Sequence, residues 1–131
     1  FQDTDVNDCA LIVRVDAPLT FSNIPHFLKK LKKFEEKKKD LQFVILNASA
    51  INNIDSTATE ALKDIAEGYK SRNIRFVITN LRGPVRDKFK QAGIFEFIGY
   101  ENFFSNDYEA LKTCEGFEPD VDTDIVFQSN K

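Results

Sequence analysis

The sequence predicts one α/β domain built on a largely parallel sheet. Three observations lead to this class: strand-like and helix-like segments alternate along the chain, one strand is apolar throughout, and the 131 residues are 42% hydrophobic with thirteen Phe. Strands that alternate with helices are joined by right-handed crossovers and therefore run parallel. A chain of this length buries roughly two-thirds of its surface, so it forms a core without disulfides.

The first half of the chain predicts a strand, a helix and a second strand. Alternating residues mark a strand at 10–15, and the apolar run at 43–46 is typical of a strand covered on both faces. Between them, Ser22 or Asn23 caps a helix with Pro25 in its first turn. Glutamates interrupt the lysine-rich face of this helix, which favours a face exposed to water. The alternatives are that the face contacts lipid headgroups or a neighbouring domain. Its apolar positions follow the helical period: Ile24, Phe27, Leu28, Leu31 and Phe34.

The central segment is a polar loop followed by a second helix that ends near Ser71. Its N-cap is Asp55, Ser56 or Thr57, the last forming a capping box with Glu60. The helical period then places an unbroken apolar stripe on one face: Ala58, Ala61, Leu62, Ile65, Ala66 and Tyr69.

The following segment predicts a strand at 74–79, a helix that stops at Gly93 and a short strand at 95–98. A final helix begins at Ser105 or Asp107 and continues through Leu111. Periodicity then stops, which divides the chain into a domain at 1–114 and an acidic, flexible tail at 115–131, where Ile125-Val126-Phe127 is the one apolar run that could dock onto the domain. The body outside the tail is close to neutral and lacks the continuous basic face that nucleic acid requires.

Most enzyme classes fail for lack of the necessary residues. His26 is the only histidine, the five glycines are dispersed, and no phosphate-binding loop or nucleophile elbow occurs. Cys9 and Cys114 lie far apart without metal-ligand spacing, which indicates reduced thiols. No apolar run is long enough to cross a membrane, and the chain has neither a signal peptide nor any Met, as expected of a domain cut from a longer protein. We therefore expect no catalysis, no metal and no cofactor.

The segment best suited to binding is the start of the second helix, at Asp55, Ser56 and Thr57. Hydroxyls in a first helical turn often do no more than cap backbone N–H groups, and that alternative stays open. The N-terminus of a helix is also electrically positive, which suits a phosphoacceptor or a docking edge. Phosphate on Ser56 would lie beside Asp55, so we expect it to change partner binding more than helix stability.

Three collinear segments carry a resemblance to a known family. They are PLTFSNIPHFLKKL, VILNASAINNIDSTATEAL and GPVRDKFKQAGIFEFIGYENFFSNDYEAL. The second resembles the central signature of STAS domains, where a buried strand and a short loop precede an Asp-Ser-[Ser/Thr]-Gly helix start. The first and third resemble the STAS domains attached to SulP-type anion transporters. Together the three segments cover most of the chain.

The resemblance implies a STAS fold, in which about four helices pack on a mixed sheet, and a non-enzymatic regulatory role. It implies a cytoplasmic position beside the transmembrane transport domain of the same parent chain, with a cytosolic regulatory protein as a further possible partner. It also allows, without requiring, a nucleotide at two turns, formed by Asp55, Ser56, Thr57, Asn80, Arg82 and Gly83.

A less close resemblance, to free-standing anti-sigma factor antagonists, gives the alternative function. In those proteins a partner kinase phosphorylates the serine after the Asp, a role that carries over to Ser56 alone. Ala58 stands where Gly is usual and Asn47 where many members have Asp. We expect the added methyl of Ala58 to hinder a kinase partner. The tight join at 39–41 leaves no room for the insertion of animal SulP relatives and favours a bacterial-type protein. A small α/β enzyme is the remaining class.

Overall fold

The computed structural model describes residues 9–114 and 125–127 of the chain. Its strands form one five-stranded sheet in the order β4-β3-β2-β1-β5, and every neighbouring pair runs parallel. The predicted α/β class with a largely parallel sheet is therefore confirmed. The elements follow one another as β1 (Ala10–Val15), α1 (Ile24–Glu36), β2 (Phe43–Asn47), α2 (Ser56–Ser71), β3 (Arg75–Thr79), α3 (Gly83–Gln91), α4 (Ile94–Ile98), the 3-10 turn η1 (Tyr100–Asn102), β4 (Phe103–Phe104), α5 (Asp107–Leu111) and β5 (Ile125–Phe127).

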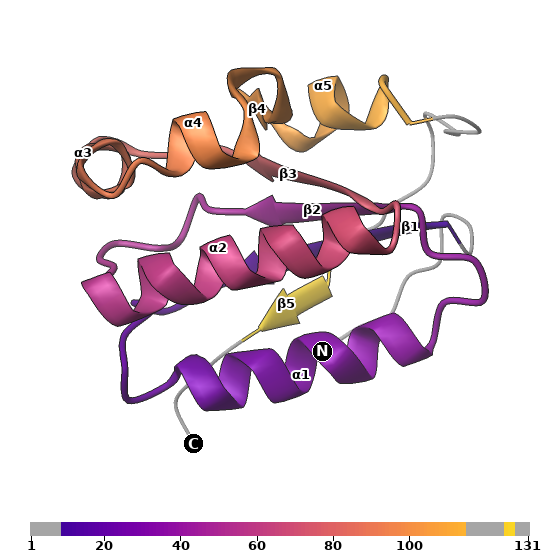
Figure 1. Ribbon diagram of the computed structural model, residues 1–131, viewed down its shortest axis with the longest axis horizontal. Helices are drawn as coiled ribbons and strands as arrows, with labels where there is room; N and C mark the ends of the chain where they lie inside the picture. The colour runs from indigo at the N-terminus through magenta and orange to yellow at the C-terminus, as the bar shows by residue number, and fades with distance from the viewer. Residues whose placement is uncertain (1–8, 115–124, 128–131) are drawn as a thin grey trace.

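The helices are divided unequally between the two faces of the sheet. Successive side chains of a strand point to opposite faces, so β1 contributes Leu11 and Val13 to one core and Ala10 and Ile12 to the other. The large core lies under α1, α2, α3 and α4. Figure 1 shows α1 below the strands and α5 above them. The small core lies under α5 and consists of Ala10, Ile12, Phe43, Ile45, Val77, Ala110, Leu111 and Cys114.

The two long helices begin at the predicted positions, but only α2 has the predicted side-chain cap. Asp55 is the N-cap of α2, which settles the choice among its three candidates. Asn23 occupies the N-cap position of α1, but its side chain caps no helical N–H. Instead the Asn23 Oδ1 accepts from the Thr20 N–H at 2.9 Å, and its Nδ2 donates to the Pro18 carbonyl at 2.7 Å. Asn23 therefore braces the turn that leads into α1.

The predicted strand at 95–98 is wrong, because these residues belong to α4. The Phe-Glu-Phe-Ile alternation resembles a half-buried strand, but Gly93 adopts a left-handed φ of 73° and turns the chain into a new helix. Gly93 still ends the preceding helix, as predicted. The fourth strand is Phe103–Phe104, which pairs with β3. The final helix is capped by Asn106, whose side chain accepts from the Glu109 N–H, rather than by Ser105 or Asp107.

Most of the predicted acidic tail lies outside the described residues, so its flexibility and the boundary at 114 stay predictions. Residues 125–127 form β5, which pairs in parallel with Val13, Arg14 and Val15 of β1. The apolar run near the end of the chain thus docks on the sheet.

Candidate functional site

The tip of α2 is held by its capping residue. The Asp55 Oδ1 accepts from the Ala58 N–H at 2.9 Å, as an N-cap should, and the Oδ2 accepts from the Phe21 N–H at 2.9 Å. Ser56 and Thr57 follow on the helix and are both exposed. The predicted capping box between Thr57 and Glu60 does not form, since Asp55 takes that role. Both hydroxyl side chains at the tip therefore face solvent.

The same contacts govern the charge of Asp55. Desolvation would raise the pKa of this carboxyl, but the hydrogen bonds from the Ala58 and Phe21 N–H groups and the positive charge of Lys88 outweigh it. The pKa of Asp55 is therefore held below its ordinary value. Asp55 stays ionised at neutral pH, so the tip presents a fixed negative charge beside two hydroxyls.

A loop from the start of the chain completes the tip. Leu19 forms an isolated parallel bridge with Ile54: its N–H donates to the Asn53 carbonyl at 3.0 Å and its carbonyl accepts from the Asp55 N–H at 3.2 Å. The neighbouring Phe21 leaves 71% of its side chain exposed. This contact was not predicted, because its only local signal in the sequence is a pair of apolar residues after Pro18.

The second predicted turn lies between β3 and α3. Asn80 adopts a left-handed φ of 59°, a conformation that Asn tolerates, and its buried Oδ1 has no hydrogen-bond partner among the described residues. Arg82 stands at the N-cap of α3 with its side chain exposed. Gly83 is exposed, and no atom lies within 4 Å of where its Cβ would be. A side chain at Gly83 would therefore meet open space.

The two turns lie at the same edge of the sheet but are not joined. Parallel strands end at one edge, so α2 and α3 both start at the carboxyl ends of β2 and β3. No hydrogen bond between described residues links the Asp55–Thr57 turn to Asn80, Arg82 or Gly83. Lys88 of α3 contributes a positive charge that helps to lower the pKa of Asp55. The structure thus brings the predicted residues to one edge of the sheet, and their joint role in binding stays a prediction.

A polar contact that sequence reasoning missed fixes α5 at this edge. Asp107 accepts from the Thr79 hydroxyl at 2.5 Å and from the Asn47 Nδ2 at 2.9 Å. Asn47 and Thr79 are direct partners in the register of β2 and β3. The available signal was that each of two buried strands ends in a polar residue, which suggests a shared partner.

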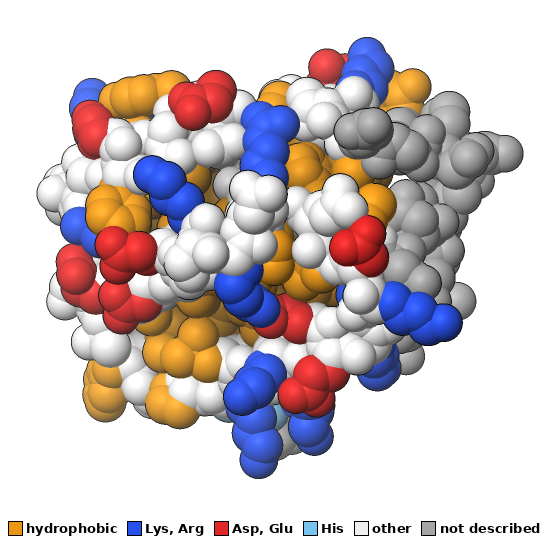
Figure 2. All heavy atoms as spheres, turned by 45° about the vertical axis from the view of Figure 1, so that its right-hand side comes forward, with side chains coloured by type: hydrophobic (Ala, Val, Ile, Leu, Met, Phe, Trp, Pro, Cys, Tyr) orange, Lys and Arg blue, Asp and Glu red, His pale blue; other side chains and the backbone are white. Residues whose placement is uncertain are grey.

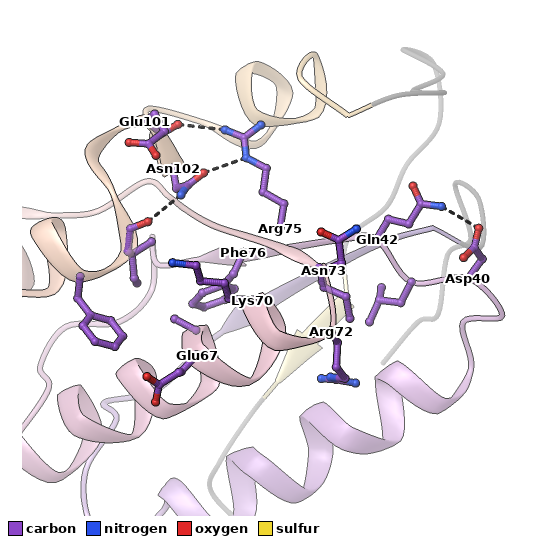
Figure 3. A pocket seen from close by; sticks show the side chains of 15 residues that line it. Asp40, Gln42, Glu67, Lys70, Arg72, Asn73, Arg75, Phe76, Glu101 and Asn102 are labelled. Carbon is purple, nitrogen blue, oxygen red and sulfur yellow. Dashed lines mark hydrogen bonds between the residues drawn. The ribbon is translucent and has the colours of Figure 1, made fainter.

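The opposite edge of the sheet carries a hollow of about 890 Å³. Figure 3 shows Lys70 and Arg72 from the end of α2 and Arg75 from β3 around it, with acidic Glu67 and Glu101 among them. The Arg75 guanidinium donates to the Asn102 Oδ1 at 2.8 Å, the Thr113 hydroxyl at 3.0 Å and the Glu101 carbonyl at 3.1 Å. This arginine is used structurally and is not available to a ligand.

The described residues offer few means for chemistry. Across 9–114 and 125–127, no group of three His, Cys, Asp or Glu side chains is placed to hold a metal ion. The same described part of the chain contains no helix long and apolar enough to cross a membrane. The exposed tip of α2 presents the hydroxyls of Ser56 and Thr57 to solvent, and its role as a binding or phosphorylation site stays a prediction.

The chain is an α/β domain whose central helix is capped by Asp and carries exposed hydroxyls at its tip. Comparisons with known proteins identify the family of this domain. A family model described as the STAS domain matches residues 2–110. The chain belongs to the STAS domain family.

Individual relatives agree with this family. The "Probable sulfate transporter 4.2" of Arabidopsis thaliana is 40% identical over 114 residues, which are 79% of this chain and 17% of that protein. A sulfate transporter family protein from Wolinella succinogenes matches with a TM-score of 0.68 at 21% identity, covering 79% of this chain and 82% of that one. The murine anion transporter Solute Carrier 26 family member A9 matches with a TM-score of 0.70 at 22% identity, covering 79% and 17%. The last two show the fold.

The plant relative is far longer than this chain. The matched part of the chain spans 17% of the length of that curated protein. The predicted bacterial origin gains no support from a plant relative. As predicted, the connection from α1 to β2 is short, occupying residues 37–42.

Proposed function

We propose that this chain is the regulatory and interaction domain of a SulP-type transporter for sulfate- or bicarbonate-class anions. The observation that carries the proposal is the STAS match over residues 2–110, together with 40% identity to a probable sulfate transporter. In this proposal the domain catalyses nothing, lies on the cytoplasmic side of the membrane and contacts the transmembrane domain of its own parent chain. A cytosolic regulatory protein is a second partner for the same surface.

The tip of α2 is the contact that the proposal assigns to these partners. Phe21 is an exposed aromatic residue, and its backbone is hydrogen-bonded to Asp55, one residue before Ser56. Aromatic side chains supply much of the binding energy at protein interfaces, and hydroxyls at the rim add directional bonds. The ionised Asp55 and the nearby Lys88 give the surface both signs of charge, which favours a polar protein surface as partner.

Anion uptake by the full-length transporter in cells tests this assignment. Phe21→Ala and Ser56→Arg are each expected to lower the uptake rate several-fold while the amount of transporter in the membrane stays constant. Phe97→Ala and Ser71→Arg are the matched controls: Phe97 is 48% exposed elsewhere on the surface, and Ser71 is exposed at the other end of α2. Wild-type uptake in both tip variants would remove the tip from the proposal.

A second candidate function, a phosphate-switched anti-sigma factor antagonist, is supported by the exposure of Ser56. The burial of Ala58, which is 0% exposed with its methyl in the large core, supports access of a kinase to Ser56. A kinase that reaches Ser56 therefore does not meet that methyl. The departure from the usual Gly is a packing feature and leaves the serine accessible.

Mass measurement after incubation with a serine kinase from a sigma-factor pathway tests the second candidate. The wild type is expected to gain one phosphate, and Ser56→Ala is expected to gain none. Ser71→Ala, at the other end of α2, should be phosphorylated like the wild type. A gain of mass that persists in Ser56→Ala would count against the phosphate switch.

Titration with GTP or ATP tests the nucleotide separately, with perturbation expected at Ser56 or Arg82.

A further inference from the structure

The outer face of α1 carries a lysine stripe, which we define as Lys29, Lys30, Lys32 and Lys33. Lys29, Lys32 and Lys33 are exposed and Lys30 is half-buried. None of the four forms an ion pair with any residue in the described part of the chain. In Figure 2, Lys and Arg side chains gather along the lower edge of the molecule, on the side where α1 lies.

The spacing of the stripe is unfavourable for the helix itself. Lys29 and Lys33 are four residues apart, and Lys29 and Lys32 are three apart, so like charges are neighbours on the helix surface and repel each other. Of the two acidic residues of α1, one is engaged elsewhere. Glu35 turns towards α2, where it accepts from the Tyr69 hydroxyl and pairs with Arg72. This leaves Glu36 as the acidic residue of α1 beside the stripe.

We infer that the lysine stripe binds the anionic phospholipid headgroups of a membrane surface. The inference rests on the proposed function for one step, since a domain of a membrane transporter is held close to a bilayer. The composition favours lipid over a protein partner. The segment from Lys29 to Lys33 contains no Arg and no aromatic residue, and lysine is depleted in protein interfaces. Lysines clustered on an amphipathic helix are the pattern that binds anionic lipid.

Flotation of the 131-residue chain with lipid vesicles tests the inference. Binding is expected to vesicles of phosphatidylglycerol mixed with phosphatidylcholine, to weaken as salt rises, and to be absent on pure phosphatidylcholine. Each lysine near an anionic surface contributes a factor of about five, so Lys29→Gln, Lys32→Gln and Lys33→Gln combined should weaken binding about a hundredfold.

A matched control removes the same charge elsewhere. The triple variant Lys70→Gln, Arg86→Gln and Lys90→Gln changes three exposed cations of α2 and α3 and should bind within a few-fold of wild type. Circular dichroism spectra of both triple variants should match the wild type, because all six side chains project from helix surfaces. If the two triple variants lose vesicle binding by the same factor, the effect depends on net charge alone. That result would overturn the assignment to α1.

The remaining outcomes are distinguishable from failure of the proposed function. Equal binding to neutral and anionic vesicles, or binding indifferent to salt, overturns the lipid assignment. A lack of binding to anionic vesicles also overturns it. Lost anion uptake in the full-length lysine triple variant would then assign the stripe to a protein contact instead. Vesicle binding is measured without transport, so its result does not depend on the test of the α2 tip.

Discussion

The two faces of the sheet are held by different means. Among the residues that the structure describes, the large core joins four helices to the strands through twenty-three buried apolar residues, whereas the small core has eight and lies under the five residues of α5. A helix so short gains little from its own hydrogen bonds. The small core is instead fastened by polar side chains at its two ends, Asp107 at one and Arg75 at the other. Buried apolar area stabilises the face under α1 to α4, whereas specific polar contacts hold α5 in place on the other face.

The largest expected effect comes from emptying the large core. Phe89→Ala removes a ring that is 0% exposed and stacks edge-on against Phe95, and should lower the free energy of unfolding by about 3–5 kcal/mol. Leu111→Ala in the small core removes a smaller side chain, 5% exposed, and should cost about 2 kcal/mol. Urea unfolding of both variants measures the difference. Equal losses would contradict the contrast between the two faces.

Removing the polar anchor of α5 should rank second. Asp107→Ala leaves the Thr79 hydroxyl, on a residue that is 0% exposed, and the Asn47 amide without their partner, at a cost of about 2–3 kcal/mol. Hydrogen exchange should accelerate in α5 and stay unchanged in α2. Glu109→Ala is the control, because its pair with Lys112 lies at the surface and contributes little. Faster exchange throughout the domain would show that Asp107 does more than position α5.

The buried polar contact of the large core should matter less. Tyr69→Phe removes the hydrogen bond at 2.5 Å from the hydroxyl to the Glu35 Oε2 and should cost about 1–2 kcal/mol, because apolar packing still holds α1 against α2. The control is Tyr100→Phe. Because Tyr100 is 65% exposed, removal of its hydroxyl should leave the unfolding midpoint unchanged. A larger loss than in Asp107→Ala would reverse the ranking of the two faces.

The same tyrosine gives a pH dependence. Burial, followed by the hydrogen bond to the Glu35 carboxylate, raises the pKa of Tyr69 above its ordinary value. The unfolded tyrosine ionises near pH 10 and the folded one only above it, so this stabilisation is complete below about pH 10 and is lost as the pH rises further. Stability measured above that pH should fall more steeply for the wild type than for Tyr69→Phe. Parallel curves would contradict the prediction.

The smallest effect is expected at the other end of the small core. Arg75→Lys keeps the charge but loses the fork that reaches Asn102, Thr113 and the Glu101 carbonyl, at about 0.5–1 kcal/mol because the side chain is half-exposed. Arg86→Lys on the exposed face of α3 should be neutral in the same urea titration. A neutral result at Arg75 as well would leave Asp107 as the anchor of α5.

The sequence predicts what depends on periodicity and misses what depends on distant partners. α1, β2 and α2 carry long or strongly apolar patterns, and all three form as expected. The segment at 95–98 is too short for its alternation to be decisive, and the left-handed backbone of Gly93 determines its state. The bond from Phe21 to Asp55 spans 34 residues and the one from Asn47 to Asp107 spans 60, so neither leaves a local signal. The start of α2 at Asp55 was predictable because a helix start has a local pattern, whereas its role as a binding site stays a prediction.

The position of β5 links the end of the chain to its beginning. β5 covers the side of β1 that β2 leaves open, over Val13 to Val15. Peeling residues 125–127 away would uncover a row of unsatisfied main-chain groups, which readily recruit a strand from another molecule. Detachment of β5 from β1 would therefore favour association between two copies of the domain.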